Sequence, residues 1–193
     1  MKLETLIEAF ADGKYPLKTV PHINALAIYD DENFAAHDFD IIGPKPRKHF
    51  AKMMKDLGFT ASGSRNFKKD GLTLQFHRPQ GTLGVHPMVN LTDSLTNGES
   101  YYILTPTEAV LALLLTDKDF LESELVDFVY SHPINFDKIK KWSKAQTVYV
   151  RYLEMVPSLK ASQRQGIEDR KSGILKRLRR ESSSQNQVDS DMR

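Results

Sequence analysis

Cysteine is absent from this chain of 193 residues, which excludes disulfide bonds and metal sites built from thiolates. Long apolar runs are absent too, since no stretch approaches the roughly eighteen residues of a membrane-spanning helix. The first residues include the acid Glu4 and lack the apolar core of a secretory signal. These absences predict a cytoplasmic protein that makes no contact with a membrane.

The remaining composition is that of a folded domain, with 40% hydrophobic and 27% charged residues. The net charge is +2, but residues 158–180 hold eight Lys or Arg side chains against two acidic ones. This segment is predicted to be a basic arm that binds the phosphates of RNA or DNA, docks on a protein partner, or is simply solvated. Residues 181–193, rich in Ser, Gln and Asn, are predicted to be a disordered tail.

Hydrophobic spacing predicts a mixture of helices and strands. The helices are expected over 3–11, 22–30, 47–57, 105–115, 122–130, 136–142 and 147–156, and the strands over 15–20, 35–43, 59–64, 72–77 and 85–91. The segment 22–30 is predicted to be a buried helix because it is apolar on nearly every side. This order predicts an α/β (α+β) fold, a small mixed sheet flanked by helices. An α/β core over 1–104 would be followed by packed helices over 105–157, with the last one ending at Pro157.

The candidate site is the acidic pair Asp38-Phe39-Asp40 in the predicted strand 35–43. On a strand, residues two apart point to the same face, so both carboxylates would lie side by side. Two adjacent carboxylates repel unless a cation lies between them, and they are the oxygen ligands that Mg²⁺ prefers. The open alternative is that both acids are simply solvated at the end of a strand.

Five pieces of the chain, in their order, resemble the nucleotidyltransferase superfold, in particular the minimal bacterial proteins of toxin–antitoxin and abortive-infection systems. The resemblance covers about residues 3–150. The pieces are Asn24-Ala25-Leu26-Ala27-Ile28-Tyr29, Asp38-Phe39-Asp40, Lys55-Asp56-Leu57-Gly58-Phe59, Ile103-Leu104-Thr105-Pro106-Thr107-Glu108-Ala109 and Pro133-Ile134-Asn135-Phe136-Asp137-Lys138-Ile139.

The resemblance implies Mg²⁺-dependent transfer of a nucleotidyl group from an NTP to a protein or RNA acceptor. Asp38 and Asp40 would hold the metal ion, and His77 would act as general base or third ligand. His37 is a candidate for a further ligand. Four basic residues are candidates for contact with phosphate: Lys45, Arg47, Lys48 and Arg65. The alternative is that they are simply solvated, at the start of a helix or near a turn. Lys68 and Lys69 are candidates of the same kind, or plain residues of a hairpin turn.

Two positions depart from the family pattern. The glycine pair of the family aligns with His22-Ile23, and its third carboxylate falls near Gln75 or His77. Glycine permits a close approach of the backbone to phosphate that other residues do not. The alternative function is therefore a catalytically inactive module of the same fold, used for binding or regulation, with nucleic-acid binding through the basic arm.

Overall fold

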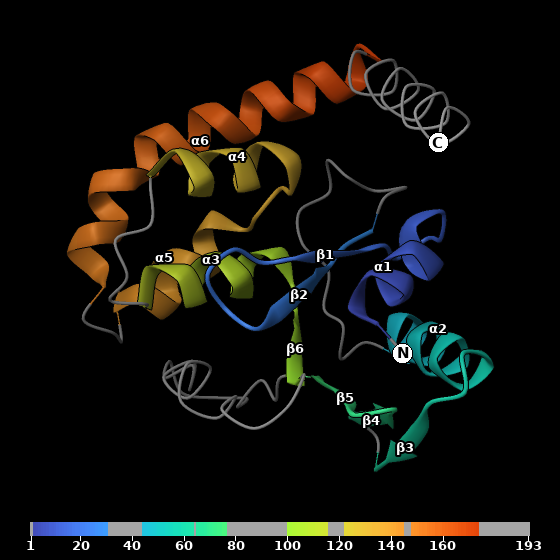
Figure 1. The fold of residues 1–193 in the computed structure, drawn as a ribbon. Helices are drawn as coiled ribbons and strands as arrows, with labels where there is room; N and C mark the ends of the chain where they lie inside the picture. Colours follow the sequence, from blue (N-terminus) through green and yellow to red (C-terminus); the bar gives the residue numbers. More distant parts are fainter. Residues whose placement is uncertain are drawn as a thin grey trace, which may run out of the picture.

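The computed structural model describes residues 2–30, 44–63, 65–76, 100–115, 122–144 and 148–173, with only the backbone for Pro44 and Lys45. The helices are α1 (Leu3–Ala11), α2 (Pro44–Asp56), α3 (Pro106–Leu115), α4 (Glu122–Ser131), α5 (Phe136–Lys144) and α6 (Tyr149–Lys171), and the strands are β1 (Leu17–Thr19), β2 (Ala25–Ile28), β3 (Thr60–Ser62), β4 (Asn66–Lys69), β5 (Leu72–Phe76) and β6 (Ser100–Leu104). The strands form one mixed sheet with helices on either side (Figure 1), which confirms the predicted α/β fold class.

The sheet has the strand order β1-β2-β6-β5-β4-β3. Strand β6 is parallel to both β2 and β5, and the other neighbours are antiparallel. The last residues of β2, β5 and β6, which are Ile28, Phe76 and Leu104, therefore lie at one end of the sheet, called here the carboxyl end.

Two hydrophobic clusters lie on opposite faces of the sheet. Side chains alternate along a strand, so Ala25 and Ala27 of β2 belong to the cluster with α3, α4, α5 and α6. Leu26 and Ile28 of the same strand belong to the cluster with α1 and α2. The four residues are all buried, because β2 is covered on both faces.

The predicted helix over 22–30 is wrong, since residues 25–28 form strand β2. A short apolar run looks the same in a buried helix and in a strand buried on both faces, so periodicity alone cannot separate them. Strands β4 and β6 have no counterpart among the predicted elements, and Lys68 and Lys69, interpreted as turn residues, belong to β4 and pair with β5. The predicted strand 85–91 and the D-x-D strand 35–43 lie outside the described residues.

The turns and helix ends follow the local signals. Asp70 and Gly71 have φ values of 48° and 85°, as a two-residue hairpin turn between β4 and β5 requires. Gly58 follows α2 with a φ of 80°, as expected of a helix cap. At the start of α3, the amide of Thr105 donates to a carboxylate oxygen of Glu108 over 2.9 Å. The amide of Glu108 donates in return to the hydroxyl of Thr105 over 3.2 Å, which completes a capping box.

Helix α6 does not end near Pro157, contrary to the prediction. It continues to Lys171, and Leu159, Gln163 and Gly166 are buried beyond the proline. Pro157 itself is exposed, and the hydrogen bond that it cannot donate would have gone to the carbonyl of Leu153, an exposed residue. The first half of the predicted basic arm is therefore a packed helix, whereas residues 174–193 lie outside the described part. None of the helices in the described ranges is both long and apolar enough to cross a membrane.

Candidate functional site

At the carboxyl end of the sheet the chain enters both segments that carry the predicted catalytic residues. Asp38 and Asp40, with His37, lie between β2 and α2, and His77 directly follows Phe76 at the end of β5. All four residues lie outside the described part of the chain. Because β2 and β5 are both parallel to β6, the two segments leave the sheet at the same end, with β6 between them.

The connections that leave β2 and β6 at this end lead to helices on opposite faces of the sheet. The chain that leaves β2 goes on to α2, whose Phe50 and Met54 belong to the cluster on one face. The chain that leaves β6 goes on to α3, which lies in the cluster on the other face. In open α/β sheets, ligands bind outside the carboxyl ends of strands where the connections lead to opposite faces in this way. The D-x-D motif belongs to the segment that leaves β2 at this point.

Two aromatic contacts place the start of α2 at the carboxyl end. The ring of Phe50 lies 4.6 Å from that of Phe76, and the ring of His49 lies 5.2 Å from that of Tyr15, just before β1. Arg47 and Lys48 immediately precede these residues in the first turns of the helix, and Lys48 is exposed. Pro44 and Pro46 have no N–H group to offer an anion, so the positive character of this end of α2 comes from the helix dipole and from the side chains of Arg47 and Lys48. The side chain of Lys45 is not among those described.

Arg65, which directly precedes strand β4, also lies at the carboxyl end of the sheet. Its carbonyl accepts a hydrogen bond of 2.9 Å from the amide of Phe76, so it lies beside the residue that precedes His77. The Nη1 atom of Arg65 is buried and has no hydrogen-bond partner among the residues that the structure describes. A buried cationic donor without a partner is unfavourable by itself and is suited to an anion. The structure therefore brings Arg47, Lys48 and Arg65 to one end of the sheet.

A buried histidine at this end was not among the predicted site residues. His132 is 4% exposed, and its Nδ1 lies 3.0 Å from the carbonyl oxygen of Phe128. Its ring stacks on Phe128 and meets the edge of Tyr29, with centroids 4.6 and 4.9 Å apart. The sequence offered only the pair His132-Pro133 as a signal, which indicates the end of a helix. His132 therefore packs between Phe128 of α4 and Tyr29, the residue that follows β2.

The position that aligns with the family's glycine pair lies at the opposite end of the sheet. His22 is in the turn between β1 and β2, at the amino end of β2, and its φ of 60° is in the left-handed region. Its Nε2 pairs with a carboxylate oxygen of Glu124 at the start of α4. The turn between β1 and β2 therefore contacts helix α4 and lies away from the carboxyl end of the sheet.

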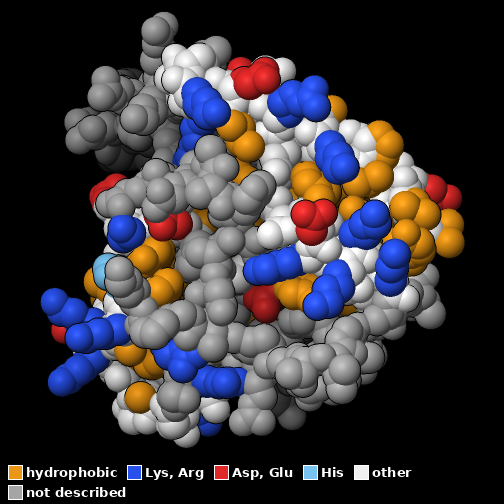
Figure 2. Space-filling view, turned by 180° about the vertical axis from the view of Figure 1, so that it is seen from behind, with side chains coloured by type: hydrophobic (Ala, Val, Ile, Leu, Met, Phe, Trp, Pro, Cys, Tyr) orange, Lys and Arg blue, Asp and Glu red, His pale blue; other side chains and the backbone are white. Residues whose placement is uncertain are grey.

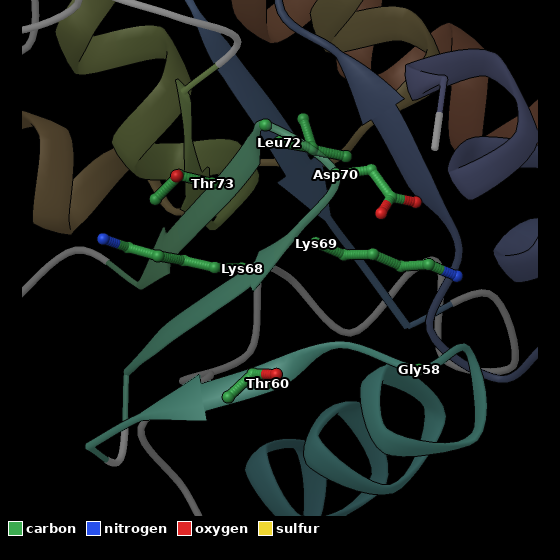
Figure 3. A pocket seen from close by; sticks show the side chains of 8 residues that line it. Gly58, Thr60, Lys68, Lys69, Asp70, Leu72 and Thr73 are labelled. Atoms are coloured by element: carbon green, nitrogen blue, oxygen red, sulfur yellow. The ribbon is translucent and has the colours of Figure 1, made fainter.

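A pocket of about 380 Å³ also lies away from the carboxyl end, around the β4–β5 turn. Figure 3 shows Lys68 and Lys69 pointing in opposite directions from adjacent positions of β4. The ammonium of Lys69 donates to the carbonyl oxygen of Leu57 over 2.5 Å and so caps the end of α2. None of the predicted catalytic residues is among the described residues that line this pocket. Besides Lys68 and Lys69, its lining consists of Gly58, Thr60, Asp70, Gly71, Leu72 and Thr73.

Within the described ranges, no three His, Asp or Glu side chains gather closely enough to hold a metal ion. Comparisons with protein-family models, with curated proteins and with solved structures find no match.

Proposed function

We propose that the chain is a nucleotidyltransferase-like protein that transfers a nucleotidyl group from an NTP to a hydroxyl group of a protein or RNA acceptor, with Mg²⁺. The supporting observation is the carboxyl end of the sheet, where the connections from β2 and β6 lead to opposite faces and where Arg47, Lys48 and Arg65 all lie. The segments with Asp38, Asp40 and His77 are attached at that same end. A cytoplasmic location, where NTPs are abundant, belongs to this proposal.

The residue types of the site suit this chemistry. Asp38 and Asp40 offer oxygen ligands, which Mg²⁺ prefers, and the ion would neutralise phosphate charge. Arg47, Lys48 and Arg65 would bind the remaining phosphate oxygens, Arg65 through donors in a planar fork. Lys45, the next basic residue towards the D-x-D motif, is assigned to the same role.

The proposed reaction is a substitution at the α-phosphorus of the NTP. The acceptor oxygen forms a bond to that phosphorus, and the bond from phosphorus to the bridging oxygen breaks, which releases pyrophosphate. The acceptor proton goes to His77 as general base, because imidazole accepts a proton near neutral pH.

The second candidate function is a catalytically inactive module of the same fold. It is favoured by His22, a non-glycine residue that aligns with the family's glycine pair, and by the neutral side chains of Gln75 and His77, near which the family's third acid falls. Such a module would serve as a binding or regulatory partner of another protein or of a nucleic acid.

Radiolabelled NTPs separate the two functions. The purified chain is incubated with each NTP and Mg²⁺, in the presence of total RNA or total protein, and label transfer is compared with pyrophosphate release. We expect both in equal amounts, and both absent with chelator or in the variant Asp38→Asn/Asp40→Asn. The control Asp12→Asn/Asp56→Asn removes two exposed acids elsewhere and should keep the wild-type rate.

Transfer that persists in the D38N/D40N variant would exclude those acids from the mechanism. No transfer to any acceptor, together with no heat of NTP binding in calorimetry, would select the inactive module.

A further inference from the structure

Helix α5 presents lysine at almost every solvent-facing position. In the sequence Phe136–Lys144, Ile139 and Ser143 are buried, and Lys140, Lys141 and Lys144 are exposed. Lys138 is a fourth lysine of the same helix, and Asp137 is its one acidic residue. The exposed charges of α5 are therefore almost all of one sign, and a surface of one sign attracts ligands of the opposite charge.

The basic surface continues from α5 onto α6. The Nζ of Lys160 lies 5.6 Å from the ring centroid of Phe136, and the Nζ of Lys144 lies 5.8 Å from that of Tyr149. These two contacts join the first residue of α5 to the middle of α6 and the last residue of α5 to the first residue of α6. Since a helix rises about 1.5 Å per residue, the two contacts lie about 12 Å apart along α5.

Like charges are adjacent along both helices. Lys140 and Lys144 are four residues apart on α5, and Lys160 and Arg164 are four residues apart on α6. Like charges at this spacing destabilise a helix, and an anion bound between them removes the repulsion. In the described part of the chain, Lys140 and Arg164 have no acidic partner within salt-bridge distance.

Exposed apolar side chains lie among these cations. Val150 and Leu153 in the first turns of α6 are 66% and 47% exposed, and Tyr149 beside them is half-buried. Figure 2 shows Lys and Arg side chains interleaved with hydrophobic ones at the right, the side on which α5 and the start of α6 lie. Cations interleaved with aromatic and apolar groups are typical of surfaces that bind single-stranded nucleic acids, because phosphates and unpaired bases need different partners.

We propose that the face formed by Lys140, Lys144, Tyr149, Lys160 and Arg164, called here the α5–α6 face, binds single-stranded nucleic acid. The four cations bind successive phosphates, and bases pack on Tyr149 and the neighbouring apolar side chains. The affinity falls steeply with salt and depends little on sequence. This binding goes beyond the proposed transferase and does not require Asp38 or Asp40.

Titration of a fluorescent oligouridine with the full chain tests the proposal by anisotropy between about 50 and 200 mM KCl. We expect the variants Lys140→Glu/Lys144→Glu and Lys160→Glu/Arg164→Glu each to bind at least about tenfold more weakly. For every phosphate that a variant no longer binds, the slope of log K against log salt should decrease in magnitude by about 0.7. The control Lys52→Glu/Lys55→Glu makes the same change of charge on exposed positions of α2 and should bind within about twofold of wild type.

Trp142 provides an independent measure of where the ligand binds. It is the one tryptophan of the chain and lies on α5, with the Nζ of Lys138 5.9 Å from its ring. We expect oligouridine to change its fluorescence, and to do so equally in a full-length variant with Lys176, Arg177, Arg179 and Arg180 all replaced by Gln. Tyr149→Ala should weaken single-strand binding more than duplex binding, because only unpaired bases stack.

Three results would overturn the proposal. The first is an equal decrease of affinity in the α2 control, which would mean that only net charge matters. The second is abolished binding in the Gln variant of residues 176–180 with unchanged binding in the α5 variant, which would place the ligand at the chain end. The third is binding to vesicles of anionic lipid without binding to oligouridine, which would make the face a membrane surface.

Discussion

Gly166 is the position where the packing of α6 can be tested most sharply. A Cβ atom at this residue would lie 2.0 Å from the carbonyl oxygen of Tyr130 and 2.8 Å from its carbonyl carbon. Both atoms belong to the backbone of α4, so no change of side-chain rotamer can remove the clash. The substitution Gly166→Ala therefore forces the two helices apart, by about 1 Å if the Cβ is to reach 3.0 Å from that oxygen.

The sign of the effect distinguishes a docked helix from a free one. In a free helix, replacing Gly by Ala stabilises by about 1 kcal/mol. In the docked helix, overpacking costs about 1–3 kcal/mol. The separation also strains Gln163, whose side chain accepts from the amide of Ile134 over 2.7 Å and donates to its carbonyl over 3.2 Å. Each buried backbone group left unpaired costs a further 1–3 kcal/mol or so. The net expectation is a destabilisation of about 2 kcal/mol or more.

Urea unfolding, followed by the fluorescence of Trp142 and by circular dichroism, measures this change. With a slope of about 1–3 kcal/mol/M, the midpoint should fall by about 1 M. Ala161→Gly, at an exposed position of the same helix, is the matched control and should cost only the helix propensity of about 1 kcal/mol. A G166A variant as stable as wild type, or more stable, would refute the packing of α6 on α4 beyond Pro157.

Three further predictions use the same unfolding assay. Thr105→Ala removes the acceptor of the α3 capping box and should cost about 1 kcal/mol, while Thr105→Ser should cost less; equal destabilisation by both would contradict the cap. His22→Gly should be more stable than His22→Ala by about 1 kcal/mol, because both lose the pair with Glu124 but only Ala keeps the unfavourable positive φ; equal stability would exclude that strain. The hydrogen bond to Asp169, with burial, raises the pKa of Tyr130. The stability that this hydrogen bond contributes is complete below about pH 10 and is lost as pH rises through the raised pKa. Tyr130→Phe should flatten this decline of stability at alkaline pH, and an unchanged pH profile would mean that other groups cause the decline.

Features with a local physical cause could be predicted from the sequence. Asp70-Gly71 forms the expected hairpin turn because these residues tolerate positive φ, and Gly58 ends α2 for the same reason. The alternating sequence Leu72-Thr73-Leu74-Gln75-Phe76 is typical of a half-buried strand, and in β5 Leu72 and Leu74 are fully buried while Gln75 is exposed. In each case the residues that determine the structure are neighbours in the sequence.

Features that depend on distant residues could not be predicted. Strand β6 is central because β2 and β5 pair with its two sides, and nothing within Ser100–Leu104 specifies those partners. Helix α6 passes Pro157 because Leu159, Gln163 and Gly166 fit against distant residues of α4 and of the segment before α5. Tertiary packing thus outweighs the local preference of proline to end a helix.

The candidate site shows the same division, because its residue types come from the sequence and its location comes from the topology. In the sequence, Asp40 comes four residues before Pro44, the start of α2, and His77 directly follows Phe76, the end of β5. Phe50 contacts Phe76 across the core, so both of these anchor points belong to one end of the sheet. A D-x-D motif attached at the amino end would be separated from His77 by the length of the strands. The parallel pairing of β6 with both β2 and β5 is therefore the feature on which a joint site for the acids and the histidine depends.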